Sequence, residues 1–455
     1  MHNGTAAATP VRHLAVLGGG ILGMFLALRL SERGHRVTVL EAAQRPGGLA
    51  VDDAIGPYRW DRFYHVILMS DRNTRALIEE LGMSDLLRWG VTRTGFYTDG
   101  TLYSLSDSLE FLRFPPLSLF DKFRLGGTIF LASRIRDWRS LESQGCSEWL
   151  EKWSGKHVFE RIWLPLLKSK LGDNYRIASA AFIWAIIARM YAARRSGLKR
   201  EMFGYLEGGY GLLLTRLESR LRERGVEMRN GTAAASVLDR GLQGVEVTTA
   251  NGDTLRFDGI IATLPTPAIA SLCPQLTESE SARLNGVTYQ GIVCASMLTR
   301  KPLSNYYVTN ITDRWVPFTG VIEMTSLVDK SAFGGSSLIY LPCYLTKDDP
   351  YWQRDDAGVR QDFIAALTRM YPHFDPADVQ SFQVARARQV LAISTLDYST
   401  RLMPGLTTSL ANVFILNSAQ IAAGTLNVNE TLGVVQERFD ALLARLEHPR
   451  EVEAV

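Results

Sequence analysis

Six residues near the N-terminus form a glycine motif that could bind a dinucleotide. Gly18, Gly20 and Gly23 occupy the glycine positions of the pattern G-x-G-x-x-G. In this pattern the first glycine permits a tight turn, the second lets backbone approach a pyrophosphate, and the third lets a helix pack closely on a strand. Ile21 and Leu22 would open that helix, whose N-terminal amides would face the phosphates.

An acidic residue follows at the distance that such a motif requires. Glu41 lies roughly 20 residues beyond the glycines, where a carboxylate can accept hydrogen bonds from ribose hydroxyls. The acid also favours a free 2′-hydroxyl over a 2′-phosphate. The alternative interpretation of the glycine motif is a tight turn in an unrelated α/β protein. The strand before the motif, the helix after it and Glu41 all disfavour this alternative.

Other polar residues could act on a substrate. His65, whose ordinary pKa is near neutrality, could accept or donate a proton, or could pack in the core with a hydrogen bond. Lys170 follows an apolar passage and could bind an anionic substrate, whereas Lys168 is expected to be a solvated surface lysine. A basic cluster could attract a carboxylate or phosphate, although a solvated helix face is favoured; its members are Arg189, Arg194, Arg195, Lys199 and Arg200.

The elements around the glycine motif predict a βαβ unit. Residues 11–17 are a short apolar run typical of a strand, residues 25–34 suit a packed helix, and residues 35–41 are β-branched and predict a second strand. A later passage predicts a helix, a strand and a hairpin that turns at Asn251-Gly252. A final strand and helix close the chain.

These passages predict an α/β fold with two domains. Residues 1–71, 201–286 and 401–455 would form a Rossmann-like nucleotide-binding domain assembled from three separated segments. Two insertions would form a mixed α+β substrate domain. Of these, residues 72–200 are expected to be mostly helical, and residues 287–400 to supply a sheet and a helix.

The stretch after the second predicted strand resembles a known family. Residues 41–48, EAAQRPGG, are similar to the E-x(3)-R-x-G-G stretch of the flavoprotein superfamily that contains flavin amine oxidases, protoporphyrinogen oxidases and phytoene desaturases. The resemblance implies that the dinucleotide is FAD, that Arg45 lies near its phosphates, and that Gly47 and Gly48 let backbone pass close to the flavin. Because no cysteine stands in a flavin-linking context, we expect non-covalent FAD.

The resemblance extends along the chain, with one departure. Residues 207–211 look like the family's middle segment, and the strand after it would contact adenine through its backbone at Ala234, where relatives carry valine. Residues 258–265 resemble the family's D-x-V-I-x-A-x-P strand. Near the C-terminus, Asn417 and Ser418 stand where most relatives have Gly-Asp. This departure is consistent with a polar substitute contact to the cofactor, with weaker FAD affinity or with a distinct subfamily.

The resemblance implies an amine oxidase-like, FAD-dependent oxidoreductase that removes hydride from a C–N or C–C unit of a small molecule, in natural-product or glycan biosynthesis. In amine oxidases a lysine near the flavin orders a water, a role for which Lys170 is the candidate. Residues 60–65 resemble a histidine-containing stretch of UDP-galactopyranose mutases, so a redox-neutral isomerase or mutase is the alternative. A non-enzymatic binding protein of the same fold is a second alternative, which Glu41 and Arg45 disfavour.

Composition excludes several other classes of protein. The 455 residues are 46% hydrophobic and 21% charged, as in ordinary globular proteins, and a net charge of +3 gives no support for nucleic-acid binding. Arg189 interrupts the most apolar stretch, residues 177–193, so no transmembrane segment is predicted. The four scattered cysteines suggest neither a metal site nor disulfides, and the first residues do not resemble a signal peptide, so we expect a cytoplasmic protein. The oligomeric state is left open.

Overall fold

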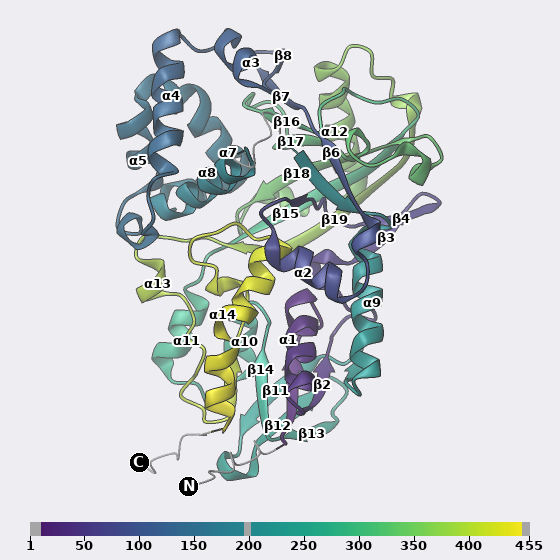
Figure 1. The fold of residues 1–455 in the computed structure, drawn as a ribbon, viewed down its shortest axis with the longest axis vertical. Helices are drawn as coiled ribbons and strands as arrows, with labels where there is room; N and C mark the ends of the chain where they lie inside the picture. Colours follow the sequence, from purple (N-terminus) through teal and green to yellow (C-terminus); the bar gives the residue numbers. More distant parts are fainter. Residues whose placement is uncertain (1–10, 195–201, 448–455) are drawn as a thin grey trace, which may run out of the picture.

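The computed structural model describes residues 11–194 and 202–447 (Figure 1). Its lower half is built on a five-stranded sheet in which every pairing is parallel. In spatial order the strands are β10 (Glu227–Arg229), β2 (Arg36–Leu40), β1 (His13–Leu17), β14 (Gly259–Ala262) and β20 (Val413–Ile415). Three widely separated parts of the chain therefore meet in one sheet.

Both faces of this sheet are covered, which explains why its strands are apolar throughout. Alternate residues of β1 face opposite sides: Leu14 and Val16 pack with three helices, and Ala15 and Leu17 with the other layer. The helices are α1 (Ile21–Glu32), α9 (Gly209–Glu223) and α14 (Val428–Glu447), and α2 (Arg72–Glu80) packs on α14. The other layer contains β11 (Ala234–Asp239), β12 (Val245–Thr249), β13 (Thr254–Phe257), α10 (Thr266–Leu272) and α11 (Glu278–Asn285).

The upper half contains a seven-stranded mixed sheet (Figure 1). Its pairings are antiparallel except for that of β16 with β7, which is parallel. In order the strands are β19 (Val379–Ala392), β15 (Tyr289–Thr299), β18 (Ser337–Leu345), β17 (Gly320–Glu323), β16 (Val308–Ile311), β7 (Thr94–Thr98) and β8 (Thr101–Ser104). Helix α12 (Asp356–Met370) packs into the core on one side of this sheet.

A block of helices stands beside this sheet, at the upper left of Figure 1. Its members are α3 (Ser108–Arg113), α4 (Leu119–Ala132), α5 (Cys146–Ser154), α6 (Lys156–Val158), α7 (Leu164–Leu171) and α8 (Ala180–Arg194). Short strands connect the two halves: β3 (Asp52–Ile55), β4 (Tyr58–Asp61), β5 (Ile67–Leu68), β6 (Leu87–Val91) and β9 (Met202–Leu206). A one-turn helix, α13 (Tyr398–Arg401), follows β19. Among the described helices, none has the length and apolarity needed to cross a bilayer.

The predicted fold class, an α/β nucleotide-binding domain with a mixed substrate domain, is confirmed. The hairpin at Asn251-Gly252 is present between β12 and β13. Within residues 72–194 helices predominate, as expected, and they are accompanied by three strands that were not predicted, β6, β7 and β8. The missed signal is Asp99-Gly100, which turns from β7 to β8 with φ of 52° and 71°, a pair of positive values that few dipeptides adopt readily.

Candidate functional site

The glycine motif forms the turn between β1 and α1. Gly18 has a φ of +109°, and its amide donates to the carbonyl of Leu40 over 2.9 Å, which ties the turn to β2. A Cβ on Gly23 would lie 1.9 Å from the Gly18 carbonyl oxygen. Only glycine therefore lets α1 pack this closely on the turn, as the sequence pattern predicts.

The first turn of α1 is open toward the space in front of it. Gly20 is the N-cap residue, and no side chain caps the helix there. A Cβ on Gly20 would have open space around it, because its nearest neighbour, the Gly48 Cα, would be 4.0 Å away. Ile21 and Leu22 bury their side chains in the core behind the turn. The uncapped amides and the clear space fit a bound pyrophosphate.

A second glycine loop lies against the first. The Gly47 amide donates to the Gly19 carbonyl over 2.8 Å, and Gly47 and Gly48 have φ values of +131° and +57°. A Cβ on Gly48 would approach the Gly20 Cα to 3.2 Å. The two loops, which are well separated in sequence, thus form one cradle in which backbone is the exposed surface.

Glu41 stands at the edge of this cradle and is half-buried. Its carboxylate accepts hydrogen bonds from the amides of Gly19, over 2.6 Å, and Ala43, over 2.8 Å. The backbone of residues 231–232 bonds to the backbone of Ala43 and Glu41, which brings the start of β11 at Ala234 alongside. The predicted ribose-binding and adenine-binding residues therefore lie together.

Arg45 extends along the surface from the same loop. Its guanidinium forms an ion pair with Asp52, which also pairs with Arg59. Burial acts to raise the pKa of Asp52, but the hydrogen bonds from Arg59 and Arg45 outweigh it and lower that pKa. About half of the Arg45 side chain is exposed (52%), so its cationic head is accessible to a phosphate as well.

The unusual Asn417-Ser418 pair follows β20. Asn417 is buried, and its amide donates to the carbonyl of Leu264 over 2.7 Å while its side-chain oxygen accepts from the amide of Ala419. Both ends of this side chain are thus used to hold neighbouring turns together. Ser418 is half-buried, which leaves its hydroxyl as the polar group of the pair that a cofactor could reach.

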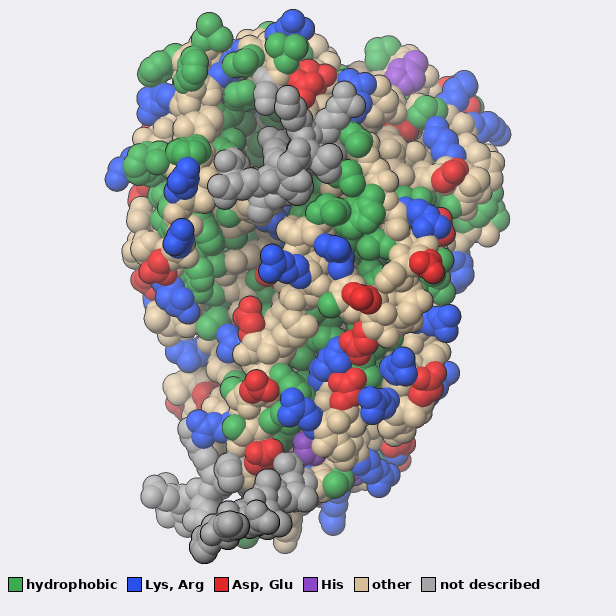
Figure 2. Space-filling model, in the orientation of Figure 1, with side chains coloured by type: hydrophobic (Ala, Val, Ile, Leu, Met, Phe, Trp, Pro, Cys, Tyr) green, Lys and Arg blue, Asp and Glu red, His purple; other side chains and the backbone are tan. Residues whose placement is uncertain are grey.

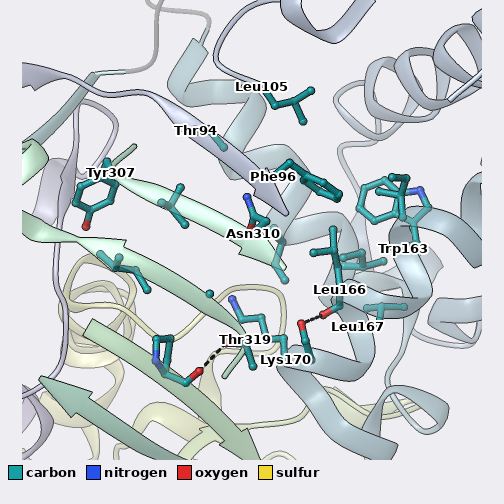
Figure 3. A pocket seen from close by; sticks show the side chains of 18 of the residues that line it. Thr94, Phe96, Leu105, Trp163, Leu166, Leu167, Lys170, Tyr307, Asn310 and Thr319 are labelled. Carbon is teal, nitrogen blue, oxygen red and sulfur yellow. Dashed lines mark hydrogen bonds between the residues drawn. The ribbon is translucent and has the colours of Figure 1, made fainter. Parts of the chain in front are cut away.

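A cavity of about 660 Å³ lies between the seven-stranded sheet and the helical block. Its walls are mainly aromatic and aliphatic side chains from α4, α7, α8 and strands of the sheet. Figure 3 shows Phe96, Trp163, Leu166 and Lys170 gathered around it. An apolar enclosure of this size, with a few polar groups, suits a small organic ligand.

Lys170 brings a positive charge to this cavity. Its amine lies 6.0 Å from the ring centroid of Tyr344 and has no hydrogen bond or ion pair with any described residue. Burial lowers the pKa of Lys170, and the nearby guanidinium of Arg189 lowers it further. A lysine held in this way has an enlarged fraction of neutral amine, which can accept a proton.

His65 is not among the described residues that line the cavity. Its ring packs against that of Tyr210, with centroids 4.8 Å apart. The Nδ1 atom lies 3.7 Å from the Asp61 carboxylate, too far for a hydrogen bond, and no described group bonds to it. The structure therefore does not bring His65 and Lys170 together in one cluster.

The remaining basic residues have other surroundings. Lys168 places its amine 5.7 Å from the ring centroid of Tyr175 and does not line the cavity. Arg189 forms an ion pair with buried Asp71, with Nη2 3.0 Å from both carboxylate oxygens. The other members of the predicted basic cluster lie outside the described residues, or have side chains that do: Arg194, Arg195, Lys199 and Arg200.

Several polar groups that share the cavity with Lys170 were not predicted from the sequence. Tyr64 and Tyr344 hydrogen-bond through their hydroxyls over 2.8 Å, and burial raises the pKa of Tyr344 to about 12. Asn310 of β16 also lines the cavity. The sequence carries no pattern that distinguishes Tyr64 from the adjacent His65 as the residue that faces the cavity.

Comparison with known proteins places this geometry in context. The family model for flavin containing amine oxidoreductases matches residues 23–413. A 4,4'-diapolycopen-4-al dehydrogenase from Metabacillus indicus is 24% identical over 305 residues, which cover 59% of this chain and 59% of that protein. The chain thus aligns with little more than half of that relative's length.

Two solved structures share the fold over nearly the whole chain. A protein described as a protoporphyrinogen oxidase from Exiguobacterium sp. 255-15 superposes with a TM-score of 0.76 at 18% identity, covering 96% of this chain and 99% of the other. A reduced UDP-galactopyranose mutase superposes with a TM-score of 0.74 at 14% identity, covering 96% and 98%. At these identities the likeness concerns the fold.

Proposed function

Because this chain belongs to the flavin containing amine oxidoreductase family, it is an FAD-dependent oxidoreductase, and we propose that it removes hydride from a C–N or C–C unit of a predominantly apolar small molecule. The cavity beside Lys170 carries this proposal. Its size and apolar walls favour an organic substrate that leaves one polar or ionisable group near the lysine. Natural-product biosynthesis is the setting that such a substrate suggests.

The connection between the cofactor cradle and the cavity supports this assignment. Asp61 accepts a hydrogen bond from the amide of Tyr210 in α9, over 2.7 Å, and so anchors its segment to the nucleotide-binding domain. A few residues on, Tyr64 and Val66 line the cavity. One short segment thus joins the nucleotide-binding domain to the cavity, which helps to bring a substrate carbon toward a dinucleotide's redox-active ring.

Bound FAD would supply the two-electron oxidation, and the chain's own residues would supply binding, orientation and proton movement. The cradle of Gly18, Gly20 and Gly48 would hold the pyrophosphate, with Glu41 on the ribose. Ser418 is the proposed contact to the ribityl or phosphate portion. The Lys170 amine would accept a proton, directly or through a water, from the nitrogen or carbon next to the carbon that loses hydride, so that a C=N or C=C bond forms.

Anaerobic mixing of the purified holoenzyme with candidate apolar amines and unsaturated precursors tests the proposed reaction. The expected result is bleaching of the flavin absorbance by an oxidisable substrate, with non-covalent FAD recovered after heat denaturation. Turnover that requires prior reduction and causes no net flavin change would instead support a redox-neutral isomerase or mutase. Recovery of FMN, or of no flavin after reconstitution, would contradict the cofactor assignment.

The two roles left open for His65 predict different results, and its contacts favour packing. Since its ring lies on Tyr210 outside the cavity lining, His65→Ala should lower the melting temperature by removing this contact. The anaerobic rate of flavin reduction in the folded variant should stay near the parental value. Stopped-flow reduction and thermal unfolding on one preparation make the comparison. A stable, fully flavin-loaded variant slowed by about 10²-fold or more would assign His65 to proton transfer.

A cytoplasmic location is also proposed. All four cysteines, Cys146, Cys273, Cys294 and Cys343, are buried free thiols. Burial raises the pKa of each, to about 12 for Cys146, Cys273 and Cys343, which keeps them protonated and unreactive. Four free thiols that form no disulfide suit a reducing compartment, and this observation supports a cytoplasmic location.

A further inference from the structure

Helices α3 and α4 expose an unusual group of large apolar side chains. Of the exposed large hydrophobic residues in the described chain, seven lie between residues 109 and 131. They are Leu109, Leu112, Leu119, Phe120, Phe123, Phe130 and Leu131, and together they define the α3–α4 surface. Phe123 is 76% exposed and Phe120 is 68% exposed. Single exposed hydrophobic residues are ordinary, but a group of this kind marks an interaction site.

The spacing in α4 places these side chains on one continuous face. Leu119, Phe123 and Phe130 recur at helical intervals, and Phe120 and Leu131 form the adjacent row. Exposed glycines at 126 and 127 fill the middle of this face without adding polarity. The opposite side of α4 is buried and mixed in character, since it carries Asp121, Lys122 and Thr128 besides Leu125 and Ala132, so the more apolar side of the helix is the exposed one.

Most of the exposed charged side chains along the α3–α4 surface are arginines. Between residues 109 and 136 the exposed charged side chains are Arg113, Arg134 and Arg136. The two acids of this stretch, Glu110 and Asp121, are not exposed and hydrogen-bond to nearby serines. Two exposed aspartates, Asp107 and Asp137, flank the stretch, and their carboxylates accept hydrogen bonds from backbone amides at the start of helical turns. Figure 2 shows green and blue side chains together at the upper left, where α4 lies in Figure 1.

The same helices border the substrate cavity from the inside. Phe111 of α3 and Leu125 and Ile129 of α4 line the cavity, while their neighbours in sequence form the α3–α4 surface. A single layer of helix therefore separates the exposed apolar face from the apolar enclosure.

We propose that the α3–α4 surface docks this protein reversibly on a membrane that contains anionic lipid. Apolar side chains would enter the headgroup region, and the three arginines would pair with lipid phosphates, as in interfacial helices. A two-fold dimer through this surface would bring like-charged arginines of both copies together, which disfavours a second copy as the occupant. The docking does not depend on the proposed reaction, although it would let an apolar substrate pass directly between bilayer and cavity.

Vesicle flotation of the holoenzyme tests this docking. The parent should bind phosphatidylcholine vesicles containing phosphatidylglycerol, more weakly in high salt and more weakly to phosphatidylcholine alone. The double variant Phe120→Ser/Phe123→Ser should lower the partition coefficient by about tenfold or more, because it removes two interfacial anchors. The matched control is Leu242→Ser, which removes a fully exposed leucine far from α4 and should change nothing. FAD content and melting temperature report on folding in each variant.

A charge variant separates the two contributions. Arg113→Gln/Arg134→Gln/Arg136→Gln should abolish the preference for anionic vesicles and the salt dependence while keeping the weak binding to phosphatidylcholine. Failure of the parent to float with anionic vesicles, or an unchanged partition of the phenylalanine variant, would overturn the proposal. So would a concentration-dependent dimer that the phenylalanine variant loses, because that result would make a second copy the occupant.

Discussion

Gly23→Ala should give a protein that retains no FAD after purification. The added methyl group would lie 1.9 Å from the Gly18 carbonyl oxygen, so either α1 or the turn has to shift. Overpacking of this kind costs about 1–3 kcal/mol and displaces the amides that would hold the pyrophosphate. Flavin absorbance per protein, with circular dichroism to report folding, measures the effect.

Two companion variants make this result interpretable. Gly126→Ala also adds a methyl group within a helix, but that methyl group meets nothing within 4 Å, so it should keep FAD and slightly raise stability. Gly20→Ala should leave the fold intact, because its methyl group would lie no nearer than 4.0 Å to the neighbouring Gly48 Cα, yet it should lower FAD affinity by narrowing the cradle. Parental FAD content in Gly23→Ala would show that the cradle does not hold the cofactor.

Lys170→Met should slow anaerobic flavin reduction by about 10²–10⁴-fold, the usual effect of removing a general base. The flavin should remain bound, since Lys170 lies in the cavity of the substrate domain rather than in the glycine cradle. The parental rate should rise with pH through the lowered pKa of Lys170, because only the neutral amine accepts a proton. Lys168→Met, on the same helix but outside the cavity lining, is the control and should retain the parental rate.

The same substitution should raise the melting temperature at neutral pH. Burial lowers the pKa of Lys170 below its value in the unfolded chain, so the folded protein binds a proton less readily than the unfolded one. This penalty is complete below the lowered pKa and disappears as pH rises toward the unfolded value. The gain from Lys170→Met should therefore shrink in alkaline buffer. A parental rate at every pH would remove Lys170 from the reaction, whatever its effect on stability.

The local parts of this site were predictable from the sequence because they are encoded locally. The turn at Gly18 and the helix after it follow from residue types within a short window, and Glu41 follows from the same βαβ unit. The cavity is different. Its lining joins Thr94, Lys170 and Tyr344, which are separated by long stretches of chain and meet only after the sheet and the helical block have packed. No periodicity within one segment carries that information.

The position of His65 shows a second limit. Sequence proximity to a flavoprotein stretch favoured His65 as a candidate, yet the adjacent Tyr64 lines the cavity. In extended chain a shift of one residue exchanges the two faces, and a segment this short has no hydrophobic alternation that fixes its register. The hairpin at Asp99-Gly100, by contrast, was encoded by its dipeptide.

The assembly of the five-stranded sheet from distant segments has a consequence for synthesis on the ribosome. Strand β1 pairs with β14, whose residues are translated some 245 positions later, and β14 in turn pairs with β20 near residue 413. Closing loops of this length carries a large entropic cost before any strand pairing repays it, which slows folding. The five-stranded sheet of the nascent chain therefore stays incomplete, with exposed strand edges, until almost the entire polypeptide has been synthesised. Unpaired strand edges are prone to aggregation, so the topology predicts that chaperone protection during that interval raises the yield of folded protein.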